Sequence, residues 1–379
     1  MTAKIKTSTT LAVTVREQHA PPLDAEVFAE NLETIFPTVC RGTPAHVGMR
    51  LAEFFAAHIR NPNTRAAYLQ AVCQFLEWAE AKQLALKDLN PFRIAAYVEN
   101  LPKRASLLIE RHRRSRKGKA YSVTVNRTKL SKPSIKQHLA AVRMLFDWLV
   151  VGQVMPMNPA SSVRGPKYVT KRGKTPVLSS DDARRLLDSI PLTRRIKTEN
   201  GERVVPDLVG LRDRALIGTM VYSFARVSAV CGMRVDDYYL NGKRCWIRLL
   251  EKGGKHHEVP AHHNAENYID AYLKAAGIGL ESGTPLFRSF RGRSGEITEL
   301  AVTRTDVFRM VKRRAKAAGL SATTCCHTFR ATGITAYLSN GGTIEKAQQI
   351  AAHESPRTTK LYDRTKDEIS LDEVERILI

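Results

Sequence analysis

A basic stretch without hydrophobic periodicity divides the chain into two parts. Residues 160–176 follow Asn158-Pro159, contain Gly165-Pro166 and Gly173, and lack the recurring apolar positions that mark a helix or a strand. Glycine and proline in such a context are typical of a linker. Because domains usually have about 100–200 residues, a chain of 379 residues interrupted here predicts two folded domains.

Residues 43–159, ahead of the linker, have the pattern of a small helical domain. One helix is predicted from a cap at Asn63-Thr64 to about Gln83, a shorter one at Phe92–Glu99, and another after Pro133-Ser134. The buried faces of the two longer helices are predicted to contain Tyr68, Val72, Phe75, Leu76 and Ala79, and Ile135, Leu139, Val142, Leu145, Phe146 and Leu149. Residues 1–42 are predicted to be irregular, and residues 103–132 (Lys103–Lys132) to be a basic loop inserted in this domain.

Residues 177–379 combine helices with a small amount of β-structure. Two strands, Cys245–Leu250 and Lys255–Pro260, are predicted on either side of a glycine-containing turn. Helices are predicted up to Ile190 and at Leu208–Tyr222, Ala265–Ala275, Arg304–Ala317, His327–Leu338, Thr343–Ala352 and, as a tail, 371–379. The predicted fold class is therefore mostly α, with an α+β second domain.

The charge of the chain indicates a polyanionic partner. Lysine and arginine number 60 against 37 acidic residues, a net charge of +23, and double-stranded DNA is the expected partner of such a protein. The surplus is concentrated in residues 101–132 and 164–174. The predicted DNA-contacting residues are Arg111, Arg113, Arg114, Arg116, Lys117, Lys119, Lys136, Arg143, Arg164, Lys167, Lys171, Arg172 and Lys174.

Other classes of protein fit the sequence poorly. No apolar run reaches the length that spans a bilayer, and Met1–Ala20 lacks the apolar core of a secretory signal. The six cysteines form neither a CxxC pair nor a zinc-finger spacing with histidines, so we expect reduced thiols and no metal site. The expectation is a soluble cytoplasmic protein that needs no cofactor.

Six residues of the second domain offer the groups that phosphodiester cleavage requires without a metal. Such cleavage needs a nucleophile, cationic donors for the non-bridging oxygens and a proton for the leaving oxygen. His327 and Arg330 share one helix face near its N-terminus, where an anion is favoured. The full candidate set is Arg226, Lys252, His327, Arg330, His353 and Tyr362.

The order of these motifs resembles the tyrosine recombinase (phage integrase) family. The resemblance rests on Ala225-Arg226-Val227-Ser228, Glu251-Lys252-Gly253-Gly254-Lys255, His327-Thr328-Phe329-Arg330, His353 and Leu361-Tyr362. The helical region resembles the core-binding (SAM-like) domain of that family, and the two domains would form a C-shaped DNA clamp.

The resemblance implies a role for each candidate. Tyr362 would attack the scissile phosphate, and Arg226 and Arg330 would hold its non-bridging oxygens. Lys252 would protonate the leaving 5′-hydroxyl, with Lys255 as the alternative lysine of the hairpin. His327 would act as acid or base near the tyrosine. His353 would donate a hydrogen bond to the phosphate.

One position departs from the pattern of the family. Three residues after Arg226, where the family usually has an acid that supports the active-site cations, this chain has Ala229. The pairing of Arg226 is therefore open, although Asp237 matches a further acid that the family often carries.

The resemblance implies a site-specific integrase of a bacterial mobile element, associated with the nucleoid. Four protomers would exchange strands on two DNA sites through a Holliday junction, with an accessory directionality factor as a possible partner. The tail helix would pack on its own domain or on a neighbouring protomer. The alternatives are a type IB topoisomerase-like enzyme that relaxes supercoils, and a DNA-binding regulator with an impaired active site.

Overall fold

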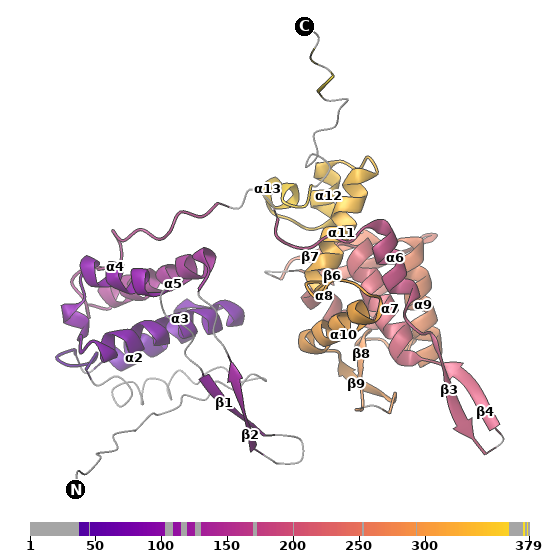
Figure 1. Ribbon diagram of the computed structural model, residues 1–379, viewed down its shortest axis with the longest axis horizontal. Coiled ribbons are helices and arrows are strands. Elements are labelled where there is room, and N and C mark those ends of the chain that lie inside the picture. Colours follow the sequence, from indigo (N-terminus) through magenta and orange to yellow (C-terminus); the bar gives the residue numbers. More distant parts are fainter. Residues whose placement is uncertain are drawn as a thin grey trace. The chain divides into compact units, whose positions relative to one another are not determined.

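A computed structural model of the chain consists of two compact units, Met1–Val169 and Thr170–Ile379 (Figure 1). The structure describes residues 38–44, 46–102, 109–114, 120–125, 130–169, 173–199, 201–251, 254–292, 294–363, 374, 375 and 377. Most described residues lie in helices, and the strands form small antiparallel sheets. This agrees with the predicted fold class. No helix among these residues has the length and apolar character needed to cross a membrane.

The first unit is a bundle of helices around one hydrophobic core. Its elements are α2 (Val47–Glu53), a π-helical turn (Phe54–His58), α3 (Pro62–Ala81), a 3₁₀ turn (Leu86–Asp88), α4 (Pro91–Asn100) and α5 (Lys132–Val151). The predicted buried faces of α3 and α5 are confirmed, except that Tyr68 is only partly buried. Phe75 meets Phe146 edge-on with ring centroids 5.8 Å apart. The cap of α3 is Asn61 rather than Asn63-Thr64, because the Asn61 side chain accepts from the amides of both those residues.

The prediction of a loop over residues 103–132 is wrong in part. Strands β1 (Ile109–Arg114) and β2 (Ala120–Val125) pair antiparallel, with Ile109 opposite Val125 and Arg114 opposite Ala120. In β2, Tyr121, Val123 and Val125 alternate with polar residues, which is a strand signal, but the dense positive charge of the surrounding stretch had favoured a loop. Residues 103–108, 115–119 and 126–129 lie outside the described residues.

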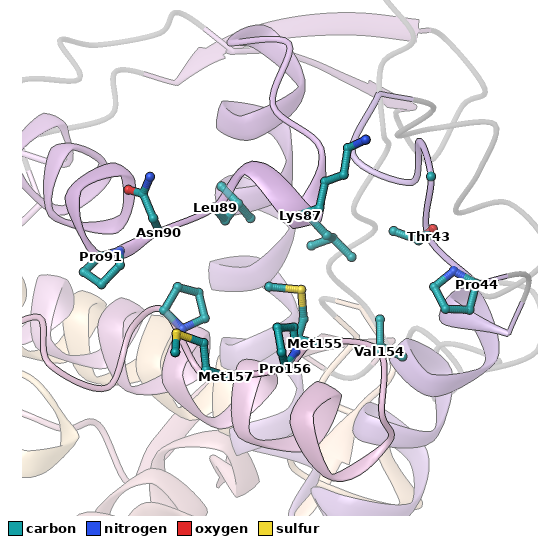
Figure 2. Close-up of a pocket in the computed structure, with 13 residues that line it drawn as sticks. Thr43, Pro44, Lys87, Leu89, Asn90, Pro91, Val154, Met155, Pro156 and Met157 are labelled. Carbon is teal, nitrogen blue, oxygen red and sulfur yellow. The ribbon is translucent and has the colours of Figure 1, made fainter.

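A pocket in the first unit opens beside the 3₁₀ turn (Figure 2). Its wall is mainly apolar and includes Pro44, Leu89, Pro91, Met155 and Met157. None of the candidate catalytic residues lines it.

The second unit contains a three-stranded antiparallel sheet, β5 (Tyr238–Asn241), β6 (Arg244–Leu250) and β7 (His256–Pro260), in the order β5-β6-β7. The two predicted strands correspond to β6 and β7. The helices are α6 (Ser180–Asp188), α7 (Leu208–Tyr222), α8 (Val227–Cys231), α9 (His263–Ala276), α10 (Arg304–Ala317), α11 (Cys326–Ser339), α12 (Ile344–Ile350) and α13 (Pro356–Lys360). Two further hairpins were not predicted: β3 (Thr193–Thr198) with β4 (Gly201–Pro206), and β8 (Arg288–Phe290) with β9 (Ile297–Ala301).

Helices α7 and α11 approach closely at a glycine. A Cβ atom at Gly333 in α11 would lie 2.1 Å from the carbonyl oxygen of Val221 and 2.8 Å from the ring of Phe224. Glycine is therefore required here for packing. This contact fixes α11, which carries His327 and Arg330, against the segment that precedes Arg226.

Candidate active site

Tyr362 lies in the second unit, just after the short helix α13, and its side chain is largely buried. Its hydroxyl is 2.5 Å from Nε2 of His327, and its ring stacks on that of His353 with an interplanar angle of 9°. The Thr335 hydroxyl donates to the backbone carbonyl of Tyr362 at 2.9 Å. The tyrosine is thus held at both its backbone and its hydroxyl, close to two of the predicted histidines.

Arg330, three residues after His327 on α11, is 1% exposed. Its Nη1 donates to the carbonyl of Phe224, and its Nη2 donates to that of Ala351 at 2.6 Å. Within the described part of the chain, its Nε has no hydrogen-bond partner. A buried N–H donor without an acceptor lowers the stability of the folded protein, and an acceptor such as a phosphate oxygen would remove that cost.

Arg226 immediately precedes helix α8 and forms an ion pair with Glu251 at the end of β6. The Arg226 side chain is 29% exposed, whereas that of Glu251 is 3% exposed. The guanidinium therefore reaches solvent while its partner carboxylate is enclosed. The pairing of Arg226, which the sequence left open at Ala229, is supplied by a residue from another element.

His353 follows helix α12, and its Nδ1 lies 3.0 Å from the hydroxyl of Thr359. Burial, followed by the charges of Arg330 and Arg226, lowers the pKa of His353 to about 3. The imidazole is therefore neutral at physiological pH. When the Thr359 hydroxyl donates to Nδ1, the Nε2–H remains available as a donor.

Burial and the charges of Arg330 and Arg226 together shift the pKa values of the site. Burial lowers the pKa of His327, and Arg330 and Arg226 lower it further. Burial raises the pKa of Tyr362, although the same two arginines partly oppose this. Burial and repulsion by Arg226 lower the pKa of Arg330 to about 10. The neutral imidazole of His327 thus faces the protonated phenol of Tyr362. A bound phosphate would stabilise the two nearby guanidiniums by its negative charge.

Other predicted residues lie elsewhere or outside the described residues. Lys252 is among the latter, and Lys255 is exposed. Of the predicted DNA contacts, Arg116, Lys117, Lys119, Lys171 and Arg172 lie outside the described residues, Arg111, Arg113 and Arg114 are in β1, and Lys136, Arg164, Lys167 and Lys174 are exposed. Arg143 donates to the carbonyls of Ala160, at 3.1 Å, and of Val163, which ties α5 to the start of the linker.

Sequence reasoning missed three residues that hold the site together. Thr335 and Thr359 fix Tyr362 and His353, and nothing in their local sequence distinguishes them from surface threonines. Glu251 had a visible signal, because it is an acid directly before Lys252. The described residues contain no cluster of histidine, cysteine or acidic side chains that could hold a metal ion.

Known proteins of similar sequence include several tyrosine recombinases. Residues 194–368 match the sequence model of the phage integrase family. The chain is 23% identical over 327 residues to a tyrosine recombinase of Pseudothermotoga lettingae, covering 86% of this chain and 96% of the relative. It is 26% identical over 331 residues to the tyrosine recombinase XerC of Xanthomonas campestris, covering 86% and 87%.

Two solved structures share the fold. The XerH site-specific recombinase bound to its palindromic difH substrate superposes with a TM-score of 0.58 at 16% identity, over 87% of this chain and 81% of that one. A lambda integrase dimer bound to a COC′ core site gives 0.57 at 17%, over 86% and 99%. Residues 194–368 therefore form a phage integrase domain, and over most of its length the chain is similar to tyrosine recombinases.

Proposed function

We propose that this chain cleaves DNA by attack of Tyr362 on the scissile phosphate, which yields a 3′-phosphotyrosyl intermediate. The observation that carries the proposal is the 2.5 Å contact between the Tyr362 hydroxyl and His327 Nε2, beside Arg226 and Arg330. A phenol is a weak nucleophile at its ordinary pKa, and an adjacent neutral base activates it.

The proposed step conserves atoms and charge. The Tyr362 proton passes to His327 Nε2 as the phenol oxygen bonds to phosphorus, and the bond to the 5′-oxygen breaks. The leaving oxygen takes a proton from Lys252, or from Lys255 as the alternative. Arg226, Arg330 and the Nε2–H of His353 stabilise the charge on the non-bridging oxygens. The reverse step rejoins the strand without another energy source, because the phosphotyrosyl bond retains the energy of the broken linkage.

The proposed biological role is that of an integrase of a mobile element acting on double-stranded DNA. One solved relative of similar fold is a lambda integrase tetramer bound to a Holliday junction, with a TM-score of 0.57. By analogy, we propose that four protomers of this chain exchange strands on two sites, with an accessory factor setting direction. The basic residues of β1 and of residues 160–169 would contact phosphates, because they supply charge without base specificity.

The test works even when the target sequence is unknown. Purified protein is incubated with a library of nicked duplexes whose central sequence is randomised. The nick lets the short 5′-hydroxyl strand diffuse away, so that rejoining fails and the covalent adduct accumulates. Adducts that survive denaturation are recovered and sequenced.

The expected result is an adduct enriched in a common sequence, with none from Tyr362→Phe. Absence of any adduct from the wild-type protein would favour the regulator with an impaired active site. Relaxation of supercoiled plasmids without sequence preference would favour the topoisomerase-like alternative. An adduct of equal yield from Tyr362→Phe would contradict the assignment of the nucleophile.

A further inference from the structure

Arg226 has no acidic partner on its own helix. Helix α8, Val227–Cys231, contains no acid, and Ala229, three residues after Arg226, is 2% exposed. A methyl side chain can neither orient a guanidinium nor balance its charge. If Arg226 holds a phosphate, another element must position it.

Glu251 meets that requirement from a distant part of the sequence. Its carboxylate pairs with Nη1 of Arg226, 25 residues earlier in the chain. We infer that Glu251 is the positioning residue of Arg226, and that it replaces the acid missing at Ala229. This inference rests on the proposed function of the site.

The geometry of the pair suits this role. Only Nη1 of Arg226 is engaged by Glu251, and the guanidinium is partly exposed, so its other N–H groups are available for a phosphate. A carboxylate as buried as that of Glu251 is unfavourable unless an ion pair compensates it. The Glu251 carboxylate therefore stays buried and fixes the position of the Arg226 guanidinium.

The backbone of Glu251 is itself fixed by the turn that ends β6. Its amide donates to the carbonyl of Lys255 at 2.8 Å, and its carbonyl accepts from the amide of Gly254 at 3.2 Å. Gly254 has a φ of 80°, a conformation that favours glycine. These two hydrogen bonds thus fix the backbone of Glu251, the partner of Arg226.

Glu251 also reduces the repulsion between the two arginines. Arg226 lowers the pKa of Arg330, and the charge of Glu251 opposes that effect. Without the carboxylate, the two guanidiniums would repel each other in a poorly solvated site. The expected consequence is displacement of Arg226, because it is the more exposed of the two.

The primary test is Glu251→Gln, which keeps the shape and the backbone contacts but removes the charge. Glu258→Gln is the matched control, because Glu258 accepts from Arg248 at 2.8 Å in an exposed ion pair on the same sheet. With a nicked duplex recovered from the library, Glu251→Gln is expected to form adduct about 100-fold more slowly at saturating protein. DNA binding and the melting temperature are expected to match those of the control.

A chemical substitution in the DNA separates positioning from general structural support. Replacing one non-bridging oxygen of the scissile phosphate by a methyl group yields a neutral methylphosphonate, which has less need of a cationic clamp. The defect of Glu251→Gln should largely disappear on this substrate. A defect of equal size on both substrates would overturn the inference, as would a wild-type rate for Glu251→Gln on the phosphate.

A double-mutant cycle with Arg226→Ala keeps the inference testable if Glu251→Gln is unstable. If Glu251 acts through Arg226, then in the Arg226→Ala background Glu251→Gln should cause no further loss of rate. Additive losses would overturn the inference. Failure of the wild-type protein to form any adduct would instead refute the proposed function, so the two failures are distinguishable.

Discussion

Replacement of Arg330 by alanine should impair folding as well as catalysis. In the structure its guanidinium donates to the carbonyls of Phe224 and Ala351, which belong to segments far apart in the sequence. Each buried carbonyl left without a donor costs about 1–3 kcal/mol, or about 2–6 kcal/mol for the pair. Removal of a buried charge offsets part of this cost, so we expect Arg330→Ala to reduce the free energy of unfolding by about 2–4 kcal/mol.

The matched control is Tyr362→Phe, which removes one hydroxyl of the same site. For a unit of this size, 1 kcal/mol corresponds to about 2–4 °C, so Arg330→Ala should melt about 4–16 °C lower than the wild-type protein. Tyr362→Phe should melt near the wild-type temperature, and both variants should form no adduct while retaining most DNA binding. If thermal unfolding showed Arg330→Ala as stable as Tyr362→Phe, the tethering role of Arg330 would be refuted.

Three further predictions test the role of His327 as the base, the packing at Gly333 and the positive charge of residues 111–119. Because burial and the two arginines lower the pKa of His327, adduct formation should stay constant from pH 8 to about 6.5 and decline at lower pH as the imidazole gains a proton; a rate that increases on acidification would exclude His327 as the base. Gly333→Ala should destabilise the second unit by about 1–3 kcal/mol, measured by urea unfolding, because its Cβ would collide with the Val221 carbonyl. Neutralising the basic residues of 111–119 should flatten the salt dependence of DNA binding by about one unit of log–log slope per lost phosphate contact, and an unchanged slope would assign the hairpin to another partner.

The helices were predictable because their burial follows a simple period. The apolar positions of α3 and α5, including Phe75 and Phe146, repeat at helical spacing, and the structure buries both completely. Strands β6 and β7 could also be predicted from the sequence, because β-branched and apolar residues lie on either side of a glycine-containing turn.

The hairpin of β3 and β4 lacks that signal. Strand β4, Gly201–Pro206, is exposed at five of its six positions and half-buried only at Val205, so no alternation of apolar and polar residues marks it. Its antiparallel pairing with β3 depends on backbone hydrogen bonds. Local sequence patterns report burial, and β4 buries too little surface to be detected.

Some residues of the candidate site could be predicted from the sequence and others could not. The side chains that contact Tyr362 could be named from ordered motifs, although His327 is 35 residues away. Thr335 and Thr359, which hold Tyr362 and His353, could not be named, because these residues become neighbours only in the folded chain. Arg143 was predicted to contact DNA from its charge, and the sequence did not indicate that its side chain also binds the carbonyls of Ala160 and Val163.

The most direct test of the central claim is to locate the covalent bond in the protein–DNA adduct. Trypsin cleaves after Lys360 and Arg364, so Tyr362 lies in the peptide 361–364. After nuclease digestion of the trapped adduct, mass spectrometry should find this peptide carrying a nucleotide through a phosphate on the tyrosine. A nucleotide on any other peptide, or an adduct in which the peptide 361–364 is unmodified, would contradict the account.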